Sequence, residues 1–211
     1  MTAHTINDFK VISLEDLDTE SIAQRVLSLQ QFWEPRSKHY GFYTIGKSAY
    51  LDGASIFYKQ QAPFFNKILI ENFPDVYITM VTCLAATLGE PVRLASDLAI
   101  PGFHIFRSDD SIKGVDGGWH IDEPHIQLKL DGTDHSTVTV AIKMPASGSG
   151  IEWLDEEKQI HYLPYKEKDM VHHSGFTVHR IAGFKEIVEG EYRITLQGHL
   201  IRRNGGMELY W

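Results

Sequence analysis

The half of the chain that decides the fold contains the segment Gly117-Gly-Trp-His120-Ile-Asp122-Glu-Pro-His125. Around it, from about Leu94 onward, short runs of alternating or β-branched residues are separated by Gly, Asp and Pro clusters, a pattern typical of short strands. We expect strands over residues 102–107, 118–122, 125–130, 137–144, 151–154, 159–163, 170–173, 177–182 and 192–202.

The residues before this half read mainly as helices. After a cap at Asp18 or Thr19, apolar residues recur at helical spacing to about residue 33. A second helix is expected over 55–73, split by Pro63, and a third over 75–88, closed by Gly89; a short strand is expected over 41–46. Short strands after a few helices predict an α+β, mainly β fold: a barrel or jelly roll buttressed by N-terminal helices.

Length and composition predict one domain, residues 1–211, with about 1–92 as helical support and about 93–211 as the β-barrel core. A chain of 211 residues with 43% hydrophobic content can bury one substantial core. The net charge of -8 argues against a nucleic-acid partner. A lone cysteine, no signal-peptide pattern and no run of about 18 apolar residues predict a cytoplasmic protein without a membrane partner.

A metal site is predicted around His120 and Asp122. In a strand, residues two apart point to one face, so both side chains can reach one ion. A third ligand is expected from residues 170–180, where His172, His173 and His179 compete. Two imidazoles and one carboxylate leave three positions of an octahedral ion open, as iron(II) oxygenases require. The competing interpretation is a surface His-Asp hydrogen bond in a turn.

A carboxylate clamp is predicted farther along the chain. Arg193 and Thr195 alternate in a predicted strand, so a guanidinium and a hydroxyl face the same way. A guanidinium binds a carboxylate through two hydrogen bonds. Arg180 and Arg202 are the alternative anchors, because fourteen positions separate His179 from Arg193 and a loop over 183–190 must absorb that length.

The order His120-X-Asp122, His179, Arg193-X-Thr195 resembles that of the iron(II)/2-oxoglutarate-dependent dioxygenases, in particular their phytanoyl-CoA and prolyl hydroxylase-like branch. The resemblance covers roughly residues 101–199; Lys168 replaces a glycine that usually opens the distal-histidine strand. It implies a double-stranded β-helix, with Fe(II) bound by His120, Asp122 and His179 and the co-substrate 2-oxoglutarate anchored by Arg193 and Thr195.

The resemblance also implies the reaction. With dioxygen and 2-oxoglutarate, such an enzyme hydroxylates or desaturates a C–H bond of a small molecule, such as an amino acid or natural-product intermediate, and releases succinate and CO₂. The carboxylate of Asp122 favours this over halogenation. Two other classes compete: a cupin-like metal-dependent hydrolase or isomerase, and a metal-free jelly-roll binding module.

Several further side chains are candidates for contact with the co-substrate or substrate. His104 and Gln127 are the first choices for co-substrate binding, whereas a lysine is more often on a solvated strand face. His125, three residues after Asp122, is expected to face away from the ion. The remaining candidates are Phe106, Trp119, Lys129, Lys143 and His199.

Overall fold

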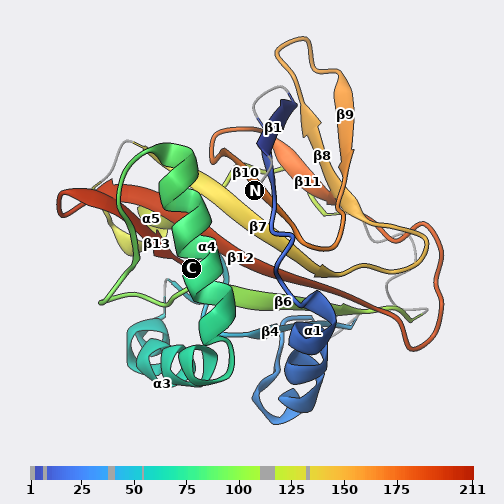
Figure 1. The fold of residues 1–211 in the computed structure, drawn as a ribbon, viewed down its shortest axis with the longest axis horizontal. Helices are drawn as coiled ribbons and strands as arrows, with labels where there is room; N and C mark the ends of the chain where they lie inside the picture. Colours follow the sequence, from blue (N-terminus) through green and yellow to red (C-terminus); the bar gives the residue numbers. More distant parts are fainter. Residues whose placement is uncertain (1–2, 7–8, 38–40, 54, 110–116, 132–133) are drawn as a thin grey trace.

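The structure is a computed structural model that describes residues 3–6, 9–37, 41–53, 55–109, 117–131 and 134–211. Its strands form two sheets, one of ten strands and one of three. In Figure 1 the longest strands cross the centre of the molecule, with the helix over residues 74–88 in front of them and the helices over residues 19–28 and 56–72 below. The expectation of a mainly β fold, a double-stranded β-helix supported by N-terminal helices, is confirmed.

The larger sheet runs in the order β1-β2-β10-β7-β12-β6-β4-β3, and β13 joins β12 to β5. All of its pairs are antiparallel except β13 with β5. Its strands are β1 (Ala3–Ile6), β2 (Phe9–Ser13), β3 (Glu34–Pro35), β4 (Phe42–Ile45), β5 (Val92–Leu94), β6 (Gly102–Arg107), β7 (Ser136–Lys143), β10 (Asp169–Ser174), β12 (Tyr192–Arg203) and β13 (Gly206–Tyr210).

The smaller sheet has the order β11-β8-β9, with antiparallel pairs. Its strands are β8 (Gly150–Leu154), β9 (Ile160–Pro164) and β11 (His179–Ala182). A compact core joins it to the larger sheet: Phe9, Val11 and Val171 pack with Trp153 and Leu163. Two members of this core, Ile151 and Tyr165, also line the pocket between the two sheets.

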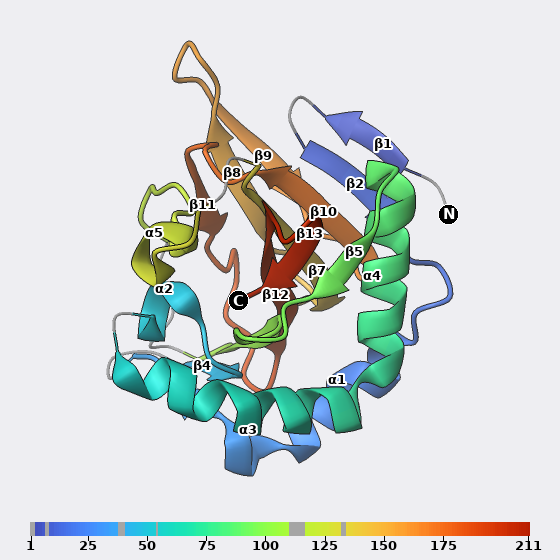
Figure 2. The same ribbon diagram turned by 90° about the vertical axis from the view of Figure 1, so that its left-hand side faces the viewer.

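The helices are α1 (Thr19–Ser28), α2 (Ala49–Asp52), α3 (Ile56–Asn72), α4 (Pro74–Leu88) and α5 (Pro124–Leu128), with a 3-10 turn at Gln30–Phe32. The Asp18 side chain caps α1 by accepting from the Ser21 amide at 3.1 Å, and Gly89 ends α4 in the left-handed region. Figure 2 shows α1, α3 and α4 wrapped around one side of the strands.

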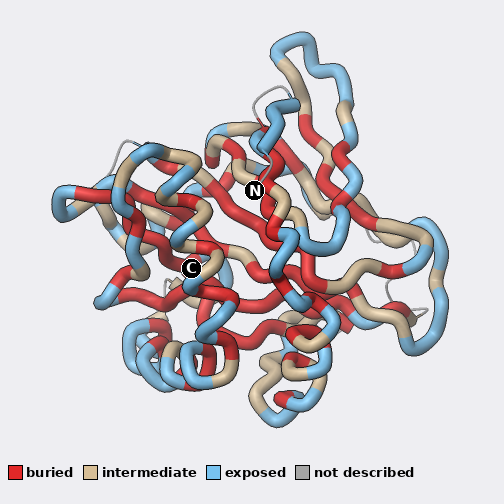
Figure 3. The backbone as a smooth tube through the Cα atoms, in the orientation of Figure 1, coloured by how far each residue is buried: buried red, intermediate tan, exposed pale blue. Residues whose placement is uncertain are grey.

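The buried residues form the main core between these helices and the larger sheet. Ile22, Leu69 and Met80 from the helices pack with Phe103 and Leu196 from the strands. Figure 3 shows the central strands buried along most of their length, while the outer helix faces are exposed. Among the described residues no single helix is long and apolar enough to cross a membrane; α3 and α4 meet that criterion only when joined, and they bend by 94° at their junction.

Three expectations about local structure were wrong. Residues 118–122 form only an isolated bridge, His120 with His179, rather than a strand. Residues 125–130, expected as a strand, instead contain most of α5, because Pro124 suits the first turn of a helix. Pro63 does not split α3: it lies on the exposed face, where water can bond the carbonyl that lacks its N–H partner.

Candidate active site

The segment that carries His120 and Asp122 is held against β11 and the turn before it by backbone hydrogen bonds. The His120 and His179 backbones bond each other in both directions, at 3.0 and 2.9 Å, and the Asp122 amide donates to the Gly175 carbonyl at 2.9 Å. The spacing between these three residues is therefore set by the main chain, although the segment is not a strand.

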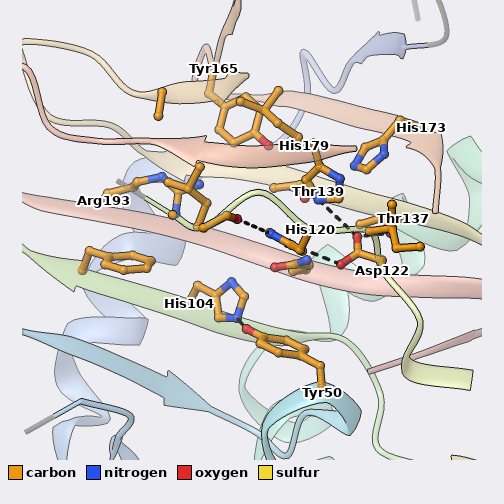
Figure 4. Close-up of a pocket in the computed structure, with 18 of the residues that line it drawn as sticks. Tyr50, His104, His120, Asp122, Thr137, Thr139, Tyr165, His173, His179 and Arg193 are labelled. Carbon is orange, nitrogen blue, oxygen red and sulfur yellow. Dashed lines mark hydrogen bonds and ion pairs between the residues drawn. The ribbon is translucent and has the colours of Figure 1, made fainter. Parts of the chain in front are cut away.

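The side chains of His120, Asp122 and His179 converge on one point. One ligand atom from each lies within 4.8 Å of the other two. The His120 Nε2 is 3.7 Å from Asp122 Oδ1, and the His179 Nε2 is 3.4 Å from Asp122 Oδ2. Figure 4 shows the three side chains facing one another across the end of a pocket. Two nitrogens and one carboxylate at this separation fit a single divalent ion.

The tautomer of both histidines suits metal binding. The His120 Nδ1 donates to the Gly118 carbonyl at 2.7 Å, and the His179 Nδ1 donates to the Thr177 carbonyl at 2.8 Å. Because each Nδ1 carries the proton, the neutral ring presents the lone pair of Nε2 to Asp122 and to any ion beside it. A backbone acceptor behind each imidazole also fixes the orientation of the ring, as is common for metal ligands.

Asp122 and His179 behave as a coupled pair. Burial alone would raise the pKa of Asp122, but the interaction with His179 and the neighbouring imidazoles holds it well below its usual range. Burial likewise opposes the charge on His179, and the interaction with Asp122 outweighs it, so the pKa of His179 is raised. The carboxylate is therefore ionised at neutral pH, as a metal ligand must be.

The competing histidines lie outside this group. His172 faces the other side of β10 and bonds the Ser136 hydroxyl at 2.8 Å. His173 bonds the Ser174 carbonyl through Nδ1 at 2.9 Å and packs edge-on against His179, with ring centroids 4.7 Å apart. Burial lowers the pKa of His173 to about 3, so that ring is neutral. Of the three candidates from residues 170–180, the structure brings His179 to His120 and Asp122.

The pocket beside His120, Asp122 and His179 has a volume of about 530 Å³ and lies between the two sheets. Arg193 lines its far end, where the guanidinium packs between the rings of Phe106 and Tyr165, 5.3 and 5.5 Å from their centroids. The Arg193 side chain is buried, yet its Nε and Nη1 have no hydrogen-bond partner among the described residues. Unpaired donors on a buried cation are costly, so this end of the pocket is suited to an anion.

The two alternative anchors are occupied at the surface. Arg180 bonds Glu152 at 2.7 Å, and Arg202 bonds Glu90 and Asp134 at 2.6 Å each. The turn and loop over residues 183–191 separate β11 from β12, which accommodates the long interval between His179 and Arg193. Arg193 is thus the arginine of the three that lines the pocket.

Only some of the other candidates for co-substrate binding line the pocket. His104 and Gln127 line the pocket, whereas Thr195 does not; its buried hydroxyl has no hydrogen-bond partner among the described residues. Phe106 also lines the pocket. Trp119 stacks on Arg180 at the surface, with 4.5 Å between the guanidinium and the ring centroid.

The remaining residues considered from the sequence lie away from the pocket. Lys129 is exposed at the end of α5, and Lys143 bonds Glu20 at 3.0 Å. His125 packs on the His135 ring, with centroids 4.5 Å apart, and is not part of the ligand group. Both lysines therefore have the solvated positions that their residue type favours.

Sequence reasoning missed some residues of the site. Tyr50, on α2, points its hydroxyl to the His104 Nε2 at 2.5 Å, and Tyr165 packs on Arg193. Burial lowers the pKa of His104 well below its usual value, so His104 is neutral and accepts from Tyr50. Thr137 donates to Asp122 Oδ2 at 2.6 Å. No local motif marks these residues, because tertiary packing alone brings them to the pocket.

No protein-family model matches the sequence, and no curated protein is significantly similar to it. Solved structures do match. An N-substituted L-amino acid dioxygenase from Burkholderia ambifaria is 11% identical with a TM-score of 0.62, and the match covers 97% of this chain and 86% of that chain.

Two further solved structures also match over most of the chain at low sequence identity. An oxidoreductase of the 2OG-Fe(II) oxygenase family from Burkholderia pseudomallei is 12% identical with a TM-score of 0.54, covering 93% of this chain and 86% of that one. A prolyl hydroxylase from Trichoplax adhaerens, in complex with a hypoxia inducible factor peptide fragment, is 12% identical with a TM-score of 0.53, covering 91% and 82%. The chain thus has the fold of the 2-oxoglutarate and iron(II) oxygenases.

Buried neutral histidines make the stability of the metal-free protein dependent on pH. Burial lowers the pKa of His172 to about 4 and that of His135 to about 3, whereas an imidazole in the unfolded chain titrates near about 6.5. Between these values the unfolded chain binds more protons than the folded one. Their contribution to the free energy of unfolding is therefore fully present above about pH 6.5 and is lost as the pH falls toward 4.

The variant His172→Gln tests this dependence. Its free energy of unfolding should fall less steeply with decreasing pH than that of the wild type, by about 1 kcal/mol per pH unit between pH 6 and 5. Denaturant titrations of metal-free protein at several pH values measure the slope. The control is His4→Gln, at an exposed position of β1. Equal slopes in wild type and His172→Gln would contradict the assignment.

Proposed function

We propose that this protein is an Fe(II)- and 2-oxoglutarate-dependent oxygenase that hydroxylates or desaturates a C–H bond of a small molecule. The observation that carries the proposal is the buried Arg193 guanidinium, with unpaired donors, in the same pocket as the His120, Asp122 and His179 group. The two competing classes explain less of the site. A metal-free binding module does not account for the ligand group, and a cupin-like hydrolase does not account for the carboxylate anchor.

The ligand group fits Fe(II) by its donor set. Two imidazole nitrogens and one carboxylate leave three positions of an octahedral ion open, whereas a closed tetrahedral zinc site would leave none. Bound Fe(II) with 2-oxoglutarate supplies the oxidising power, through dioxygen, that a C–H bond requires. The protein contributes His120, Asp122 and His179 as ligands and orients the two rings through the Gly118 and Thr177 carbonyls.

The opposite end of the pocket fits the far carboxylate of 2-oxoglutarate. Arg193 offers its Nε and Nη1 there, and the rings of Phe106 and Tyr165 pack on its guanidinium. In a site of low polarity a charge-assisted, two-point hydrogen bond is strong. We assign co-substrate anchoring to Arg193, with Gln127 and His104, which line the same pocket, as neighbouring contributors.

A small substrate fits the size and lining of the pocket. About 530 Å³ must hold both the co-substrate and the reacting part of the substrate, and pockets of this size are typical of small-molecule sites. Apolar and aromatic side chains line it beside the polar groups: Phe42, Phe106, Ile151, Ile181 and Phe184. Of the neighbours, one is by name an amino acid dioxygenase, and a second structure of it was solved in complex with alpha-KG.

An anaerobic titration tests the proposal. Addition of 2-oxoglutarate to the Fe(II)-loaded protein without dioxygen should produce a visible metal-to-ligand charge-transfer band, because the co-substrate chelates the ion through two oxygens. The same amount of succinate, which lacks the 2-oxo group, is the control and should produce none. If the Fe(II) protein gives no band at millimolar 2-oxoglutarate, the proposed function is wrong.

A further inference from the structure

The Thr137 hydroxyl links the Asp122 carboxylate to a second buried residue, His199. Thr137 Oγ1 lies 2.6 Å from Asp122 Oδ2 and 3.1 Å from His199 Nδ1. All three side chains are buried: their residues are 1%, 7% and 0% exposed. Burial strengthens these hydrogen bonds, and the two contacts form a short chain, here called the relay, that ends on Asp122.

The direction of the relay follows from the number of protons. A hydroxyl has one proton to donate, and an ionised carboxylate can only accept. Thr137 therefore donates to Asp122, so its oxygen must accept from His199, which requires the proton of the neutral imidazole to be on Nδ1. With any other placement of the protons, one of the two hydrogen bonds of Thr137 would lack a donor.

The sheet holds the relay in place. Thr137 on β7 and His199 on β12 are directly opposed partners in the antiparallel ladder. The His199 ring is packed between the rings of His135 and Tyr210, with centroids at 5.6 and 5.8 Å. The hydroxyl thus approaches Asp122 from a strand pair with a fixed register, and its position does not depend on the ion.

We propose that Thr137 and His199 are positioning residues that engage one oxygen of Asp122, so that the carboxylate offers the ion one oxygen instead of two. This inference rests on the proposed function. Carboxylates bind metals through one or both oxygens. Three open positions on the ion would suffice for a co-substrate bound through two oxygens and for dioxygen. If Asp122 bound through both of its oxygens, it would occupy one of these positions. The relay thereby keeps the last position open.

The test compares a pair of variants at each residue, with Co(II) as a redox-stable probe. Thr137→Val keeps the shape and removes the hydroxyl, whereas Thr137→Ser keeps the hydroxyl and removes the methyl. His199→Leu removes the ring donor, whereas His199→Asn places an N–H near the position of Nδ1. Co(II) affinity by calorimetry, the visible ligand-field spectrum and the melting temperature of the metal-free protein are measured for each variant.

We expect Thr137→Val and His199→Leu to bind Co(II) about 10- to 100-fold more weakly, the range usual for groups that orient a ligand, with an altered ligand-field spectrum. Thr137→Ser and His199→Asn should stay within a few-fold of the wild type. If Thr137→Val does not fold, the His199 pair decides the matter in the same way.

Two results would overturn the inference while leaving the proposed function intact. One is wild-type Co(II) affinity and spectrum in both Thr137→Val and His199→Leu. The other is equal loss in the matched partners, Thr137→Val with Thr137→Ser and His199→Leu with His199→Asn, because a packing defect would then explain both. A wild-type protein that binds no Co(II) would instead overturn the proposed function, on which the inference rests.

Discussion

Asp122→Ala is expected to abolish 2-oxoglutarate-dependent turnover and to weaken Fe(II) or Co(II) binding by more than about 100-fold, beyond the range usual for residues that only orient a ligand. The carboxylate is the one anionic ligand of the group, and its loss leaves two imidazoles facing a divalent charge. Metal affinity is measured by anaerobic calorimetry, and turnover by succinate released in the presence of 2-oxoglutarate.

Asp155→Ala is the matched control. Asp155 also pairs with a histidine, His161, at 2.6 Å, but at the surface after β8. Removal of that pair should leave metal affinity and turnover unchanged. If Asp122→Ala bound Fe(II) as tightly as the wild type, or formed product at the wild-type rate, the assignment of the ligand group would be wrong.

Arg193→Met is expected to raise the KM for 2-oxoglutarate by about 100-fold or more. A buried carboxylate left without its partner costs about 3 kcal/mol or more, and about 1.4 kcal/mol corresponds to a factor of ten in affinity. Arg193→Lys should recover part of this loss, because an ammonium supplies the charge without the two-point geometry of a guanidinium. Steady-state kinetics with varied 2-oxoglutarate give the KM of each variant.

The affinity for Co(II) should be nearly unchanged in both Arg193 variants, since Arg193 lies at the other end of the pocket from Asp122. Arg202→Ala is the matched control, because Arg202 is an arginine of the same strand that pairs with Glu90 and Asp134 at the surface. An unchanged KM in Arg193→Met, or an equal rise in Arg202→Ala, would refute the anchor.

Much of the sheet could be predicted from the sequence because its strands alternate or are β-branched between clear turn signals. The bounds of β6 agree with expectation, and those of β7, β8, β10 and β12 differ by one or two residues. The strands that escaped prediction, β1, β2, β3, β5 and β13, lie at the ends of the chain or beside helices. Their pairing partners are distant in sequence, and short segments of this kind carry little periodic signal.

The candidate metal-ligand group could be predicted from the sequence, but the local structure differs from the strand that the sequence indicates. His120 and Asp122 were paired because residues two apart in a strand share a face, yet the structure has only an isolated bridge there. They converge because backbone bonds to His179 and Gly175 hold the segment. Thr137 and Tyr50 could not be inferred at all, since strand register and helix packing, rather than local pattern, bring them to the pocket.

The backbone bridge between His120 and His179 has a consequence for which metal the protein carries. The two candidate ligand rings are spaced by main-chain hydrogen bonds and oriented by backbone carbonyls, and none of these contacts involves an ion. A metal site of fixed geometry can exchange its ion without refolding. It then binds divalent ions in the order of their intrinsic affinity, which rises from Fe(II) through Co(II) and Ni(II) to Cu(II). Under the proposed function, we expect iron occupancy to depend on the metal supply of the cell, because tighter-binding divalent ions would compete for the same three ligands.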